Sequence, residues 1–326
     1  MIKDKGLVSV IVASYNHAKY LPKRMESLLS QTYTNLEIIV IDDCSTDNSR
    51  EVLSYYTYDS RVNLILKEKN EGWVAVSNQG AKMAKGDYVI FANCDDYCHI
   101  KMIESLVLGI RSSKNIGVSF CRSEMVDQNN ISIGNDYDVR EKSFRELCIK
   151  STIIYSKEIY KFFLNSCVIP NLSAALIKKE CFEKVGYFSD TYKACCDWDI
   201  FLKIFDSYDA YYVSDEYNSF RQHNNTIRSA LKGKIEYEEF IRLLLSQIRD
   251  NNRLTFIEKM KYRTHVMKLW ILHLTNKNDK GYNNFKYHFT IVYEYDKISL
   301  IYFIPGLINR ILELVIKLLI KIFKYK

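Results

Sequence analysis

Three short apolar runs, each followed directly by polar residues, constrain the possible folds of this chain more than any other feature. The runs are residues 8–12, 37–41 and 87–91, and they lead into Ala13-Ser14-Tyr15-Asn16, Asp42-Asp43 and Asn93-Cys94-Asp95-Asp96. Runs rich in β-branched residues, with helical patterns between them, are typical of buried strands in a parallel sheet. Because ligands of such sheets bind beyond the carboxyl ends of the strands, we expect one tyrosine and two pairs of carboxylates to share a crevice. That is the layout of a site for a nucleotide and a metal ion.

The rest of the first 230 residues continues the alternation of strand and helix. Further strands are predicted at 62–66, 116–120, 174–177 and 210–213, whereas residues 127–165 follow no pattern that places them. From residue 231 onward the pattern is helical. The sequence therefore predicts an α/β fold, with a mostly parallel sheet flanked by helices over 1–230 and a helical region over 231–326.

Charge is distributed unevenly between these two regions. Residues 231–326 hold 18 Lys+Arg against 9 Asp+Glu, a net of +9, whereas the whole chain carries +7. The first 230 residues are thus slightly acidic. A basic region of this kind predicts an anionic partner, either a membrane or a nucleic acid.

The C-terminal segment 305–326 combines positive charge with a long apolar face. Helical spacing places five charged residues on one side, and apolar residues cover the rest; the charged residues are Arg310, Glu313, Lys317, Lys321 and Lys324. These charges disfavour a transmembrane span. We expect a basic amphipathic helix in the bilayer interface, with its cations against lipid headgroups. The alternative is a helix packed on the enzyme or on a second copy in a homodimer.

The cysteines point to a reducing compartment. The nine cysteines show no paired CxxC spacing and no HxxxH partner, so a zinc site is not expected. Their number is odd, and residues 1–5 run straight into the first strand without a signal-peptide pattern. We expect reduced thiols and a cytoplasmic protein, peripheral on the inner face of the cell membrane.

Seven motifs, in order along residues 7–225, resemble the family 2 glycosyltransferases, which have the GT-A fold. They are residues 8–16, 41–47, 70–72 with Asn78, 86–89 through 95–96, 186–188, 197–199 and 220–223. The resemblance implies an inverting enzyme that uses a nucleotide sugar and a divalent metal ion, Mn²⁺ or Mg²⁺.

The resemblance also implies a role for each matching residue. Tyr15 would stack on uracil beside Ala13, Asp43 would hydrogen-bond the base, Asp42 would lie near the ribose, and Asn78 would complete the nucleotide site. Asp96 would hold the metal, and Asp95 would contact ribose or metal. Asp197 would be the catalytic base, with Arg221 and His223 near the diphosphate or the acceptor. Two positions depart from the family: Asn93 replaces the first aspartate of the metal motif, and Cys196 replaces the acid before Asp197.

Taken singly, these residues also have structural explanations. Asp197 or the pair Asp95-Asp96 could cap a helix, Tyr15 could belong to the core, and His223 could be a structural histidine. Together at the strand ends they favour binding and catalysis.

Three functions remain possible from the sequence. The first is transfer of a sugar from a nucleotide donor, expected to be a UDP-sugar, to a hydroxyl of a lipid-linked or cell-surface glycan. The second is a sugar-nucleotide pyrophosphorylase, but that class opens with a glycine-rich loop where this chain has Ala13-Ser14-Tyr15-Asn16. The third is a non-catalytic protein that binds membrane or nucleic acid. It leaves the acids unexplained, and because acids repel phosphate backbones, we expect no nucleic acid partner.

Overall fold

The computed structural model describes residues 6–138, 140, 142–169, 171–223, 234–274 and 285–324. The chain forms two compact units, and each is described by itself. Unit 1 comprises Met1–Thr191 with Cys196–Asn224, and unit 2 comprises Tyr192–Cys195 with Asn225–Lys326. The boundary predicted near residue 231 lies outside the described residues.

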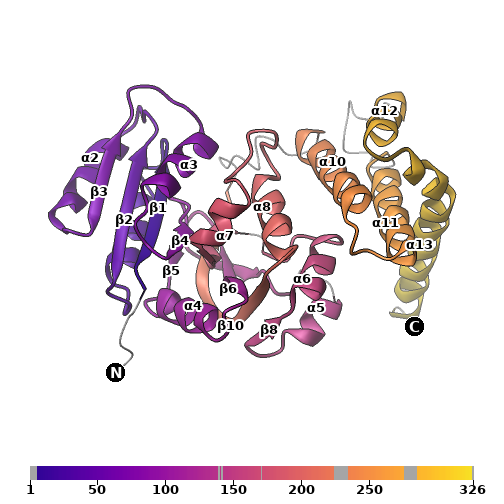
Figure 1. The fold of residues 1–326 in the computed structure, drawn as a ribbon, viewed down its shortest axis with the longest axis horizontal. Helices are drawn as coiled ribbons and strands as arrows, with labels where there is room; N and C mark the ends of the chain where they lie inside the picture. The colour runs from indigo at the N-terminus through magenta and orange to yellow at the C-terminus, as the bar shows by residue number, and fades with distance from the viewer. Residues whose placement is uncertain are drawn as a thin grey trace. The chain divides into compact units, whose positions relative to one another are not determined.

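Unit 1 is a layered α/β structure (Figure 1). Its strands are β1 Val8–Ser14, β2 Leu36–Asp42, β3 Val62–Leu66, β4 Tyr88–Phe91, β5 Tyr97–Cys98, β6 Ile116–Val126, β7 Ser132–Asn135, β8 Thr152–Ile154, β9 Ala175–Lys178 and β10 Asp209–Arg221. Its helices are α1 Leu21–Leu29, α2 Ser49–Ser54, α3 Trp73–Met83, α4 Met102–Arg111, α5 Lys142–Leu147, α6 Ser156–Phe163, α7 Lys179–Lys184 and α8 Cys196–Phe205, with 3-10 turns η1 Tyr55–Tyr58 and η2 Leu172–Ala174. The predicted α/β class is confirmed.

The sheet is parallel in its first half and mixed in its second. Its strand order is β3-β2-β1-β4-β9-β6-β10-β5, and β3, β2, β1 and β4 are all parallel to their neighbours within this group. The chain order reverses between β1 and β4, which is where ligands bind in open α/β sheets. The register pairs Ser14 with Asp42 and Ile11 with Phe91. The polar residues after these three strands therefore emerge at one edge.

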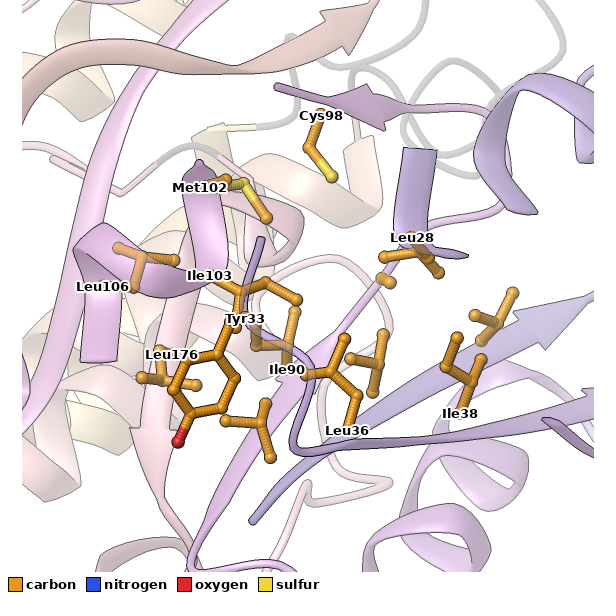
Figure 2. Packing of buried hydrophobic residues seen from close by; sticks show 14 of the residues in the cluster. Leu28, Tyr33, Leu36, Ile38, Ile90, Cys98, Met102, Ile103, Leu106 and Leu176 are labelled. Carbon is orange, nitrogen blue, oxygen red and sulfur yellow. The ribbon is translucent and has the colours of Figure 1, made fainter. Parts of the chain in front are cut away.

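Burial of the apolar runs explains why these strands form. Figure 2 shows Ile38 of β2 and Ile90 of β4 in a cluster with side chains from α1 and α4, among them Leu28 and Ile103. All four are fully buried. Each such side chain stabilises the fold by about 1.5–3 kcal/mol relative to exposure. This core thus packs the strands against α1 and α4 beneath the carboxyl edge of the sheet.

Residues 127–165, which the sequence left unplaced, add short pieces to this sheet. Strand β7 pairs antiparallel with β6, and β8 pairs antiparallel with β10, while α5 and α6 occupy the remainder. The predicted strands at 116–120 and 210–213 are the starts of the longer β6 and β10. This half of the sheet is built by pairing between segments far apart in the sequence.

Unit 2 is helical, as predicted. Its elements are α10 Lys234–Asp250, α11 Phe256–Leu274, α12 Phe285–Asp296, the 3-10 turn η3 Lys297–Tyr302 and α13 Phe303–Lys324. Helix α13 packs closely on α11: a Cβ added to Gly306 would lie 2.9 Å from the backbone nitrogen of Lys268. The Lys268 ammonium also pairs with Glu313 at 2.7 Å.

The orientation of α13 corrects one expectation. The Arg310 side chain is 17% exposed and pairs with Glu313 of the same helix. Because Glu313 also pairs with Lys268 of α11, the described part of the charged stripe lies on the side of α13 that faces α11 rather than on its outer face. The apolar residues face outward instead; they are Ile304, Leu307, Ile308, Ile311, Leu312 and Leu314. The side chains of Lys317, Lys321 and Lys324 lie outside the described residues. Among the helices that are described, none has the length and apolar character to cross a bilayer.

Candidate active site at the strand edge

The loop after β1 presents an aromatic ring at the carboxyl edge of the sheet. Tyr15 is 43% exposed, whereas Ala13, still within β1, is half-buried. Asn16 adopts a left-handed backbone with φ 56°, which asparagine tolerates better than most residues. Its side-chain oxygen accepts a hydrogen bond from the Thr46 amide at 2.8 Å. The turn is thereby held against the loop after β2.

The two acids at the end of β2 support neighbouring loops. The oxygens of Asp43 each accept one backbone amide, from Glu71 and Gly72, both at 2.8 Å. Asp42 is fully buried, and one of its oxygens accepts from the Ser45 amide and the Arg50 guanidinium, both at 2.9 Å. The role predicted for Asp42 near the ribose stays a prediction, and its burial favours a structural role.

Asn78 connects two of the sequence motifs. Its amide donates to the Phe188 carbonyl at 2.8 Å, and its carbonyl accepts from the Phe188 amide at 3.0 Å. Helix α3 is thus tied to the turn at residues 186–188. A nucleotide-binding role for Asn78 stays a prediction, and both of its polar groups already have backbone partners.

Asp96 lies at the centre of a buried hydrogen-bond network. It is 1% exposed, and one oxygen accepts from the Asn171 amide at 2.7 Å and the Ser173 hydroxyl at 2.8 Å. The other oxygen accepts from the Arg221 backbone amide at 2.9 Å. Burial and the charge of Asp95 raise the pKa of Asp96 to about 6. The carboxylate therefore ties the loop after β4 to η2 and to the end of β10.

Asp95, by contrast, meets two imidazoles. The Nε2 atom of His223 lies 3.0 Å from an Asp95 oxygen. His17, Asp95 and His223 each place one potential ligand atom within 4.8 Å of the others. Burial disfavours the charged form of Asp95, but the hydrogen bond from His223 and the charges of both histidines outweigh it, so its pKa is lowered. Asp95 is therefore an ionised carboxylate beside two imidazole side chains.

The side chain of Arg221 positions the loop that carries Asp95. Its guanidinium donates to the Asp95 carbonyl at 2.7 Å, the Asp127 carbonyl at 2.9 Å and the Asn130 side chain at 2.7 Å. The residue is 2% exposed. A contact with the diphosphate or acceptor stays a prediction, whereas the observed bonds position the loop that carries Asp95.

Neighbouring side chains explain why residue 93 is asparagine where the family has aspartate. The side-chain amide of Asn93 donates to the Asn171 oxygen at 3.2 Å and lies 3.4 Å from an Asp96 oxygen. A carboxylate here would face that of Asp96, and like charges at such a distance disfavour each other. Asparagine therefore supplies a donor to the network.

Asp197 lies in the first turn of α8 and is half-buried. One of its oxygens accepts from the Trp198 amide at 2.8 Å, and the Trp198 indole donates to the Phe163 carbonyl at 3.0 Å. Cys196, which stands where the family has an acid before Asp197, is buried. Asp199 pairs instead with Lys203 at 2.5 Å. Asp197 as the base stays a prediction.

Sequence reasoning missed three residues of this site. His17 lies two residues after Tyr15, and its place in the same loop was the available signal. Asn171 and Ser173 lie 75 and 77 residues along the chain from Asp96, the acid that they contact, and follow no motif. Only the fold brings them to Asp96.

Comparison with known proteins agrees with this geometry. The model of glycosyl transferase family 2 matches residues 9–186. Glycosyltransferase GlyG of Streptococcus pneumoniae is 33% identical over 187 residues, which are 56% of this chain and 60% of GlyG. The match thus spans less than two thirds of that relative.

Two solved structures share the fold. S. aureus TarS 1-349 in complex with UDP-GlcNAc has a TM-score of 0.67 at 19% identity, covering 91% of this chain and 83% of that one. The mannosyltransferase PcManGT from Pyrobaculum calidifontis, in complex with GDP-Man and Mn²⁺, has a TM-score of 0.54 at 14% identity, covering 95% and 88%. With the family model matching more than half of its length, the chain belongs to glycosyl transferase family 2.

Proposed function

We propose that the protein is a metal-dependent, inverting glycosyltransferase that moves a sugar from a nucleoside diphosphate to a hydroxyl group. The observation that carries this proposal is the group of Asp95, His223 and His17 at the edge where the parallel strands end. Family membership supports sugar transfer rather than a pyrophosphorylase or a non-catalytic binding protein. The likeness to TarS, solved with UDP-GlcNAc, supports a UDP-sugar as donor.

The loops after β1 and β2 would bind the base. The exposed ring of Tyr15 offers a surface for stacking on uracil. Each Asp43 oxygen accepts one backbone amide, and because a carboxylate has about four acceptor positions, Asp43 can still accept a base N–H. These residues would orient the donor with its diphosphate toward Asp95.

The metal would be held by Asp95 and His223 rather than by Asp96. Both oxygens of Asp96 already accept hydrogen bonds inside the protein, whereas Asp95 lies beside two imidazoles, which suit a divalent ion. On binding, the ion would displace the proton that His223 Nε2 shares with Asp95. A bound ion would offset the charge that develops on the leaving diphosphate. Asp96 would position the Asp95 loop through its bonds to η2 and β10.

Asp197 would accept the proton of the attacking hydroxyl. With Cys196 buried beside it, Asp197 is the single carboxylate at the position where the family carries its base. Attack in line with the departing diphosphate would invert the anomeric carbon. A positioned base of this kind contributes about 10²–10⁴-fold to the rate.

The outer face of α13 would lie on an anionic membrane that presents a lipid-linked or cell-surface glycan acceptor. Six apolar residues of this helix, from Ile304 to Leu314, are exposed, and the region from residue 231 carries a net charge of +9. An apolar face on a basic element favours the interface of an anionic bilayer. The charge also disfavours pairing with a second copy of the same basic region.

Hydrolysis of the donor tests the enzymatic proposal before the acceptor is identified. The protein is incubated with Mn²⁺ and a panel of UDP- and GDP-sugars, and release of the nucleotide is measured. We expect one donor to be cleaved slowly, with activity lost in Asp95→Asn and kept in Asp215→Asn, which alters an exposed acid on β10. Failure to bind or cleave any nucleotide sugar would contradict the proposal.

A further inference from the structure

We propose that His17 is a third ligand of the divalent ion, and that two imidazoles and one carboxylate make the site prefer Mn²⁺ or Co²⁺ to Mg²⁺. This inference rests on the proposed metal site at Asp95 and His223. It adds a ligand from the loop after β1. The choice of metal then depends on this histidine as well as on the acids of the Asp95-Asp96 pair.

The three side chains converge from separate parts of the fold. His17 follows β1, Asp95 follows β4, and His223 follows β10, yet their ligand atoms lie within 4.8 Å of one another. The ligands of a divalent ion with metal–nitrogen distances of about 2 Å are about 3–4 Å apart. Small side-chain movements therefore suffice to close the group around an ion.

The hydrogen bond of His17 fixes which ring nitrogen is available. Its Nδ1 lies 2.6 Å from the carbonyl oxygen of Tyr15. Because a carbonyl can only accept, Nδ1 carries the proton, and in the neutral ring Nε2 keeps its lone pair. Metal-binding histidines commonly donate one ring N–H to a backbone carbonyl or a carboxylate in this way, which orients the ring and raises its basicity.

Hydrogen bonds to the loop after β2 and to α2 also fix the backbone around His17. The amide of His17 donates to the Ser49 hydroxyl at 3.1 Å, and the preceding Asn16 bonds the Thr46 amide. Tyr20 packs against both imidazoles, with ring centroids 6.1 Å from His17 and 5.2 Å from His223. The two imidazole rings meet edge-on at 6.2 Å. Both donors are thus positioned before any ion arrives.

The donor set determines the metal preference. Mg²⁺ favours oxygen ligands and is usually bound through one or two carboxylates together with substrate phosphates. Imidazole suits the transition metals, whose affinity for nitrogen ligands rises along the series from Mn²⁺ to Cu²⁺. A site with one carboxylate and two imidazoles therefore gains more from Mn²⁺ or Co²⁺ than from Mg²⁺.

Metal titration without nucleotide tests this inference. Free Mn²⁺ is followed by electron paramagnetic resonance for the wild type, His17→Gln, Asp95→Asn and the control His99→Gln, an exposed histidine outside the cluster. We expect His17→Gln to weaken Mn²⁺ binding by about 10–100-fold, with a smaller loss for Mg²⁺ measured by competition. His17→Asp restores a ligand and should shift the preference toward Mg²⁺.

The outcomes separate this inference from the metal site on which it depends. Unchanged Mn²⁺ affinity in His17→Gln, with a large loss in Asp95→Asn, would overturn the role of His17 and leave the proposed site intact. Unchanged affinity in both variants would remove the site itself. Pulsed resonance on wild-type protein loaded with Mn²⁺ gives an independent answer if a variant misfolds: coupling to two imidazoles supports the inference, and coupling to one contradicts it.

Discussion

The strand edge of unit 1 buries polar side chains, whereas helix α13 of unit 2 exposes apolar ones. At the strand edge a carboxylate, Asp96, is 1% exposed and bonded on both oxygens, whereas on α13 Ile308 is 52% exposed. Burial of a charge is tolerated where partners satisfy it. A row of exposed apolar side chains instead marks a surface that meets a partner. The comparison separates groups that build the fold from groups left available for binding.

The same distinction applies within the strand edge itself. Asp96, Asn78 and Arg221 direct their polar groups to backbone or to buried side chains. Tyr15 and Asp95 are more accessible, with 43% of Tyr15 and 16% of the Asp95 side chain exposed. This difference supports the proposal that Tyr15 and Asp95 contact substrate and metal, whereas Asp96, Asn78 and Arg221 position them.

The largest effect is expected at Asp197. The variant Asp197→Asn should lose transfer by about 10²–10⁴-fold because it removes a general base, while nucleotide affinity stays unchanged. Steady-state transfer and calorimetric UDP binding measure the two quantities, with Asp215→Asn as the control. Normal turnover of Asp197→Asn with its acceptor would mean that another residue is the base.

Replacement of Asp95 and replacement of Asp96 should lower the free energy of unfolding by different amounts. Asp96→Ala leaves the buried donors of Asn171, Ser173 and Arg221 unpaired, so we expect a loss of about 3 kcal/mol or more in the free energy of unfolding. Asp95→Ala leaves one buried partner, His223, without its bond instead of three, so we expect a smaller loss of about 1–2 kcal/mol. Urea unfolding compares them, and equal losses would invalidate the division between positioning and binding groups.

Polar substitutions on α13 should weaken membrane attachment without unfolding unit 2. The double variant Ile304→Ser/Ile308→Ser removes two exposed apolar side chains, and we expect binding to anionic liposomes to fall by roughly 10–100-fold. Asn309→Ser, on an exposed polar position of the same helix, should bind normally. Full attachment of the double variant in a flotation assay would mean that this face does not contact lipid.

A smaller effect is expected at Asn78. Replacement by alanine breaks both bonds to the Phe188 backbone, which should cost about 1–3 kcal/mol of stability and leave nucleotide affinity within about twofold, as for a residue outside the ligand site. Thermal unfolding and UDP binding measure these separately. Unchanged stability of Asn78→Ala together with lost UDP affinity would mean that Asn78 contacts the nucleotide.

Local pattern predicts the parallel half of the fold well. The apolar runs of β1, β2 and β4 are buried on both faces, so composition alone distinguishes them. The second half depends on pairing across long separations: β7 and β8 are short, partly exposed strands that exist because β6 and β10 accept them. No periodicity within 127–165 encodes that pairing.

The candidate site shows the same limit. The acids and Tyr15 lie at strand ends and could be predicted from position. The different roles of Asp95 and Asp96 depend on Asn171 and Ser173, which the fold brings to Asp96 from 75 and 77 residues away. Likewise, the outward face of α13 depends on its contact with α11 through Gly306, and helical spacing alone does not show which face is covered.

Calorimetric UDP binding with and without Mn²⁺ tests the central claim, that Asp95 rather than Asp96 anchors a metal at the strand edge. For the wild type and for Asp215→Asn, Mn²⁺ should raise UDP affinity at least tenfold, about 1.4 kcal/mol. For Asp95→Asn the affinity should be the same with and without the ion. A metal response that persists in Asp95→Asn, or its absence from the wild type, would contradict the account.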